Sequence, residues 1–157
     1  MSQSMDPIRE EHRHLLPHIE SLRRAADLAP GDDAREAAEE AHRFLVEHLL
    51  PHAKAEDRVL YPAVEEAMGA PGAAATMTRD HVEVETLTRD LGDLRPRLGG
   101  DPGDAAWTEL RRILYGLHAL VAVHFAKEEE IYLPILDARL SAEEGERIVH
   151  EMHGEHG

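Results

Sequence analysis

The sequence predicts an all-α protein folded as an antiparallel, up-down-up-down four-helix bundle with a short fifth helix at its C-terminal end. Clusters of glycine, proline and aspartate divide the chain into four long segments, and apolar residues recur within these segments at helical spacing. No stretch shows the alternating pattern of a strand. Short connections between long helices favour antiparallel neighbours. With 157 residues, 42% of them hydrophobic, the chain is expected to form a single domain over 1–157.

The four long helices are each expected to start at a cap and to end at a break. The first helix is predicted over 7–28, because Asp6 suits a cap and Pro7 is tolerated at the first helical position. Aspartate or threonine near each start supports three further helices, predicted over 33–60, 78–94 and 104–131. Pro17 and Pro51 interrupt the first two helices and are expected to kink them, because an interior proline loses a hydrogen bond and clashes with the preceding turn.

The C-terminal segment carries its own helix signal. Ser141 and Glu144 have the spacing of a capping box, which predicts a short helix over 142–152. A polar tail is expected to follow, and its histidines are His150, His153 and His156.

Charge and composition exclude several function classes. Lys and Arg total 17 against 32 Asp and Glu, so nucleic acid and anionic membranes are poor partners. No apolar run approaches the length of a membrane span and the start does not resemble a signal peptide, so a cytoplasmic location is expected. The chain has no cysteine but twelve histidines, so a bound metal must have nitrogen and oxygen ligands.

One pattern, His-x-x-x-Glu-x-x-x-x-x-Pro, occurs twice. It begins at His52 and Glu56 and again at His124 and Glu128. Residues four apart lie roughly 40° apart around a helix, so both side chains of a pair can reach one ion. The spacing alone is weak evidence, since solvated His–Glu pairs on a polar face would show it too. The shared proline context makes metal binding the favoured interpretation.

A third pair and a further histidine complete a candidate ligand set on four helices. His81 and Glu85 repeat the spacing on the third helix, and the first helix offers His12. Imidazoles mixed with carboxylates suit Fe, Mn or Zn, and carboxylates that can bridge favour a dinuclear site. Two non-haem iron ions, bridged by carboxylates and an oxo or hydroxo group, are the leading prediction, ahead of Mn and Zn. The predicted ligands are His12, His52, Glu56, His81, Glu85, His124 and Glu128.

Three more histidines are expected to form a second polar layer. His18, His48 and His118 lie four or six residues from predicted ligands, which places them roughly 6–9 Å away along the helices. Two interpretations stay open, namely histidines that support the ligands and an additional metal site.

These residues resemble the hemerythrin-like, or HHE cation-binding, domains. The resemblance rests on Glu11-His12, His52-x-x-x-Glu56 followed by Leu-Tyr-Pro, Asp80-His81, and His124-x-x-x-Glu128 followed by Pro134. It implies that His52 and His124 are terminal iron ligands, that Glu56 and Glu128 bridge, and that His12 and His81 complete the two coordination spheres. Oxygen-carrying hemerythrins differ at position 85, where they have a histidine, and have an Asp as the bridging acid on helix four.

The carboxylate at position 85 directs the functional expectation. A harder, more anionic ligand set stabilises ferric iron, so the site is expected to react with O2 or peroxide rather than to transport oxygen. Whether the chain is a peroxide-decomposing enzyme of the catalase or peroxidase kind is left open. The alternatives are a metal-storage or iron-sensing module without turnover, an oxygen-binding protein, and a zinc-stabilised structural bundle. Tyr61 and Tyr132 are expected to be core residues or hydrogen-bond donors beside the site. The oligomeric state is not predicted.

Overall fold

The computed structural model describes residues 3–154, and every regular element within that range is helical, which confirms the all-α prediction. There are four long helical stretches and a fifth, shorter helix. In chain order they are α1 (Asp6–Asp27); α2 (Asp32–Phe44) continuing through η1 (Leu45–Leu49), α3 (Leu50–Ala55) and η2 (Glu56–Leu60) into α4 (Tyr61–Met68); α5 (Ala75–Leu94) with η3 (Arg95–Leu98); α6 (Asp104–Lys127) continuing through η4 (Glu128–Tyr132) into α7 (Leu133–Arg139); and α8 (Ala142–Gly154).

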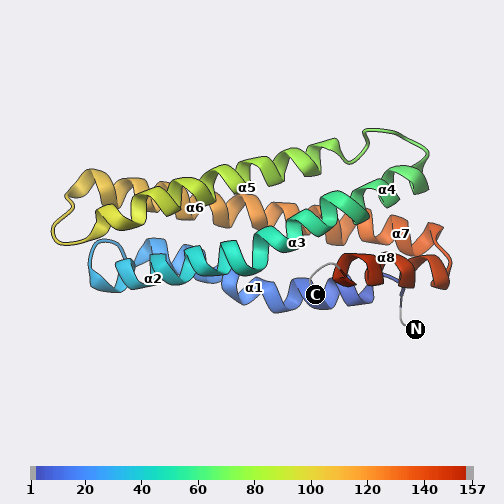
Figure 1. The fold of residues 1–157 in the computed structure, drawn as a ribbon, viewed down its shortest axis with the longest axis horizontal. Helices are drawn as coiled ribbons and strands as arrows, with labels where there is room; N and C mark the ends of the chain where they lie inside the picture. Colours follow the sequence, from blue (N-terminus) through green and yellow to red (C-terminus); the bar gives the residue numbers. More distant parts are fainter. Residues whose placement is uncertain (1–2, 155–157) are drawn as a thin grey trace.

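The long stretches lie side by side along the longest axis of the molecule, and α8 folds back beside the beginning of α1 (Figure 1). Helix α1 packs against α2 and α6, and α5 packs against α6. Two apolar clusters fill the interior. The larger one includes Leu22, Leu45, Leu91, Leu110 and Leu114. The smaller one includes Met5, Ile8, Leu60, Val64 and Leu133.

Three turns of π-helix accommodate prolines inside the long stretches. The stretches η1, η2 and η4 each end two residues before a proline, at Pro51, Pro62 and Pro134. In each case the residue just before the proline donates its N–H to the carbonyl five residues back, as from Tyr61 to Glu56. The wider turn suits proline, which lacks an N–H and would clash with the carbonyl four residues back. Helix α1, by contrast, contains Pro17 and remains α-helical from Asp6 to Asp27.

The π turns also correct the expected ends of two helices. The stretches predicted over 33–60 and 104–131 continue to Met68 and Arg139, because a π turn before each proline lets the helix continue past it. Helix α5 begins at Ala75 rather than near residue 78.

The capping box at the start of α8 is confirmed. The backbone N–H of Glu144 donates to Ser141 Oγ, and the N–H of Ser141 donates to Glu144 Oε1, each at 3.1 Å. The helix continues past 152 to Gly154, so His150 and His153 belong to it, while His156 lies outside the described residues. Between residues 3 and 154, no helix is both long and apolar enough to cross a membrane.

Candidate metal centre

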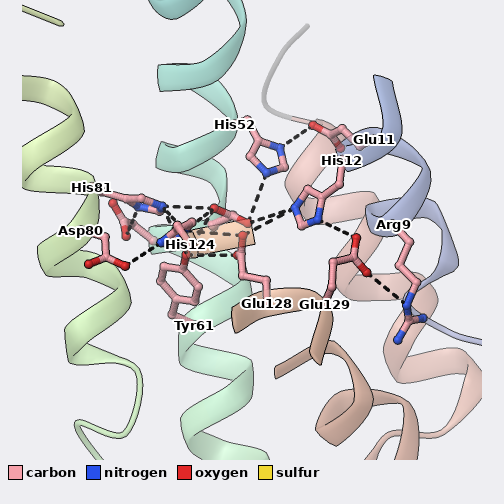
Figure 2. Close-up of polar contacts among 12 residues, drawn as sticks. Arg9, Glu11, His12, His52, Tyr61, Asp80, His81, His124, Glu128 and Glu129 are labelled. Atoms are coloured by element: carbon pink, nitrogen blue, oxygen red, sulfur yellow. Dashed lines mark hydrogen bonds and ion pairs between the residues drawn. The ribbon is translucent and has the colours of Figure 1, made fainter. Parts of the chain in front are cut away.

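Six titratable side chains converge between the two apolar clusters, and all are buried, with at most 7% of each residue exposed. Every long helical stretch contributes to this group, which we call the His/Glu cluster (Figure 2). Its members are His12 of α1, His52 of α3, Glu56 of η2, His81 of α5, His124 of α6 and Glu128 of η4.

Four atoms of the cluster form a first position for an ion. They are Nε2 of His12 and His52, Oε2 of Glu56 and Oε1 of Glu128, and although buried they make no hydrogen bond among the described residues. His52 Nε2 lies 3.2 Å from Glu56 Oε2, and His12 Nε2 lies 3.6 Å from Glu128 Oε1. Ligands held about 2.1 Å from one ion would have roughly this separation. Unpaired buried polar atoms are costly, so the four donors fit a cation.

A second position lies beside the first and shares Glu56. His81 Nε2 is 3.0 Å from His124 Nε2 and 3.2 Å from Glu56 Oε1. Glu56 therefore presents one oxygen to each position, as a bridging carboxylate must. Glu128 Oε1 lies 3.6 Å from His12 Nε2 and 3.5 Å from His124 Nε2, so it also faces imidazoles of both positions.

Tyr61 lies at this second position, which agrees with one of the two roles expected for it, a hydrogen-bond donor beside the site. Its hydroxyl lies 2.9 Å from His124 Nε2 and 3.2 Å from His81 Nε2. It can donate to Glu56 Oε1 at 3.3 Å or to Glu128 Oε2 at 3.1 Å. Tyr61 follows Glu56 by five residues across the π turn η2. The corresponding residue after Glu128 is Leu133, because Tyr132 follows it by only four.

A ring of carboxylates holds the four imidazoles in place. Each histidine donates its Nδ1 hydrogen to an acid on a neighbouring stretch, which turns Nε2 inward. Each acid also stands next to a cluster residue in the sequence. The pairs are His12 with Glu129 (2.9 Å), His52 with Glu11 (2.7 Å), His81 with Asp57 (2.9 Å) and His124 with Asp80 (2.9 Å).

Without a metal ion, the cluster shifts the pKa of several members. Burial alone would lower the pKa of His52, but the carboxylates of Glu56 and Glu11 raise it to about 10. Burial likewise opposes the charged form of His81, yet Asp57 and Glu56 raise its pKa to about 9. Burial raises the pKa of Glu128, and the nearby charge of Glu56 raises it further. The metal-free cluster therefore binds protons that an ion would displace.

The expectation that Glu85 joins the donors is not met, because its side chain is exposed and belongs to neither group of donors. Around α5 the buried residues Val84 and Thr88 lie roughly 60° and 20° to one side of His81, whereas Glu85 lies about 40° to the other side. On the helices that carry His52 and His124, the buried face instead lies on the side of the glutamate four residues later, Glu56 or Glu128.

His18, His48 and His118 do not form a polar layer beside the cluster. The exposed rings of His18 and His48 lie against Phe44, with ring centroids 4.9 and 6.3 Å from it. His118 Nε2 donates to Glu20 at 3.0 Å on the outside of the α1–α6 pair. None of the three belongs to a group of potential metal ligands among residues 3–154. Sequence spacing did not indicate their direction around the helix, and all three lie outside the His/Glu cluster.

A small cavity of about 10 Å³ adjoins the cluster. Glu56 and the imidazoles of His52, His81 and His124 line one side, and apolar side chains line the rest, namely Leu49, Ala53, Val84, Val121 and Phe125. This volume is roughly that of one water-sized molecule.

Comparison with known proteins agrees with this geometry. The Hemerythrin HHE cation binding domain family model matches residues 4–102, a range that contains His12, His52, Glu56 and His81. No curated protein and no solved structure matches the chain. Because the match covers more than half of the 157 residues, the chain belongs to the hemerythrin HHE cation-binding domain family.

Proposed function

We propose that this protein holds two non-haem iron ions in the His/Glu cluster and reacts with O2 or peroxide. His12 and His52 would bind one ion, His81 and His124 the other, and the two glutamates would bridge. Four imidazoles mixed with two carboxylates suit iron, with manganese and zinc as less favoured occupants. When bound, the iron pair would supply the electrons that O2 or peroxide accepts.

The observation that carries this proposal is the cavity of about 10 Å³ beside the ligands. Its volume is too small for an organic substrate, and its largely apolar wall suits a small neutral molecule. The first position has four protein donors, whereas iron commonly takes up to six ligands. Coordination sites are therefore left for a small molecule.

Tyr61, rather than the predicted ligand Glu85, would supply a further oxygen group at the second position. Its phenolic oxygen is a hard donor, and burial together with Glu56 and Glu128 raises its pKa above the usual range. The group therefore keeps its proton in the metal-free protein. It is placed to donate a hydrogen bond at the second position, or to supply an oxygen ligand there.

Rapid mixing of the anaerobic, Fe(II)-loaded protein with O2 or with hydrogen peroxide tests the proposal. We expect irreversible conversion to a ferric species that absorbs in the near-ultraviolet and visible. A zinc-loaded sample serves as the control, because zinc neither reacts with O2 nor absorbs in this range. A stable oxygen adduct that releases O2 under vacuum, or iron that stays ferrous, would contradict the proposal.

The remaining details belong to the same proposal. The helices would form an antiparallel up-down-up-down bundle, which the packing of α1 and α5 against α6 supports. The protein would act in the cytoplasm on a small molecule, without nucleic acid or membrane partners, in keeping with its excess of acidic residues.

A further inference from the structure

Helix α8 lies outside the four long stretches and is held by few buried residues. Only Gly145 and Met152 of its thirteen residues are buried. Gly145 lies so close to the turn before α1 that a Cβ there would stand 2.5 Å from Ser4 Cβ. Open grooves of about 490 and 580 Å³ flank the helix. A helix with so few buried contacts is expected to detach more readily than the rest of the fold.

The last turn of α8 nevertheless reaches the metal centre through a chain of two hydrogen bonds. His153 Nε2 donates to Glu11 Oε2 at 2.8 Å, and Glu11 Oε1 accepts the Nδ1 hydrogen of His52 at 2.7 Å. Each oxygen of Glu11 thus contacts one imidazole. Met152, the neighbour of His153, is buried in the smaller apolar cluster, so the ring of His153 approaches Glu11 from an anchored turn.

The same arrangement recurs at two other acids of the carboxylate ring. Lys127 Nζ donates to Asp80 at 2.7 Å, and Arg9 Nε lies 3.6 Å from Glu129. Both cations lie on the stretches that carry the cluster. His153 takes the corresponding place for Glu11 but comes from the fifth helix, so Glu11, unlike Asp80 and Glu129, contacts an element outside the four stretches.

We propose that His153 is a positioning residue for the metal ligand His52, acting through Glu11, and that metal binding at the first position and docking of α8 favour each other. This inference rests on the proposed metal centre. A bound ion fixes the His52 ring, which fixes Glu11 as the acceptor for His153. By linkage, a docked α8 must strengthen metal binding by the same factor.

The first test is the rate at which Co²⁺ leaves the loaded full-length protein for a chelator. Loss of a direct partner of a metal-bound histidine typically weakens binding 10–100-fold, so for His153→Ala, one step further out, we expect one ion to leave about 3- to 10-fold faster. His150→Ala, an exposed histidine on the same helix, is the matched control and should not change the rate. His153→Gln keeps an N–H donor and should recover part of the wild-type rate.

The second test is hydrogen exchange of the α8 amides. We expect exchange in wild-type α8 to slow when metal is bound, and this difference to disappear in His153→Ala. Two results would overturn the inference while leaving the metal centre intact. One is an equal rate of Co²⁺ dissociation from His153→Ala and wild type, and the other is hydrogen exchange in wild-type α8 that is equally fast with and without metal. Wild-type protein that binds no Co²⁺ would instead overturn the proposed metal centre.

Discussion

Replacing Asp80 by alanine should weaken metal binding without touching a ligand. Asp80 Oδ2 accepts hydrogen bonds from His124 Nδ1 at 2.9 Å and from Lys127 Nζ at 2.7 Å. A hydrogen bond to a charged group contributes about 1.5–3 kcal/mol. Loss of a partner of this kind lowers metal affinity roughly 10–100-fold, which corresponds to about 1.4–2.7 kcal/mol. These two ranges of free energy agree. Because Asp80 accepts two such hydrogen bonds, we expect the loss of affinity in Asp80→Ala to lie near the upper end of the range, at roughly 100-fold.

Asp80→Asn refines this prediction. Asparagine keeps an acceptor oxygen for His124 but loses the negative charge, so its effect should lie near the lower end, about tenfold. Asp93→Ala, an exposed acid on the same helix, is the control. Competition with a chromophoric chelator for Co²⁺ or Zn²⁺ measures the affinities, and circular dichroism verifies the helix content. Asp80→Ala with an affinity within about twofold of wild type would refute the supporting role of the carboxylate ring.

Three further predictions concern proton release on metal binding, access of O2 to the His/Glu cluster, and packing of the apolar core. Metal binding at pH 7.5 should release protons, because His52 and His81 have pKa values of about 10 and about 9 and must lose their charge. Affinity should therefore weaken as the pH falls, and equal calorimetric heats in buffers of different ionisation enthalpy would contradict this. Ala53→Leu should fill the cavity of about 10 Å³ and slow oxidation by O2 at least about tenfold in stopped flow. It should leave two ions bound, and the exposed Ala119→Leu should have no effect; an unchanged rate for Ala53→Leu would count against access through the cavity. Leu110→Ala, at a fully buried site, should lower the free energy of unfolding by about 2–5 kcal/mol in denaturant titrations of metal-free protein, and a loss below about 1 kcal/mol would be inconsistent with the packing described.

The helical segments could be predicted from the sequence because glycine and proline mark the connections and apolar periodicity marks the buried faces. The ends predicted at residues 60 and 131, shortly before Pro62 and Pro134, were wrong, since proline normally interrupts an α-helix but does not do so here. Here a π turn precedes each proline, and local sequence does not distinguish a helix end from such a turn. The repeated spacing from glutamate to proline did mark these turns, but its structural meaning emerged only from the fold.

The candidate site was predictable to the extent that it depends on position along each helix. The structure brings together six of the seven predicted donors, and the exception is Glu85. The residues that follow the three histidines, Ala53, Val82 and Phe125, are all apolar, so the sequence does not distinguish them. Only the fold shows that Val82 is exposed, whereas Ala53 and Phe125 are buried.

The partners within the carboxylate ring could not be assigned from the sequence for another reason. Four of the six cluster residues have an acid beside them in the sequence, for example Glu11 beside His12 and Asp80 beside His81. Which imidazole it contacts depends on which helices are neighbours, and that is decided by tertiary packing. The link from His153 to Glu11 joins residues 142 positions apart, so no local pattern indicates it.

The most direct test of the central claim is the iron content of the protein after anaerobic loading with Fe(II) and removal of unbound metal. The account predicts two iron ions per chain, because the His/Glu cluster offers two adjacent positions that share Glu56. One iron ion per chain or fewer would contradict it.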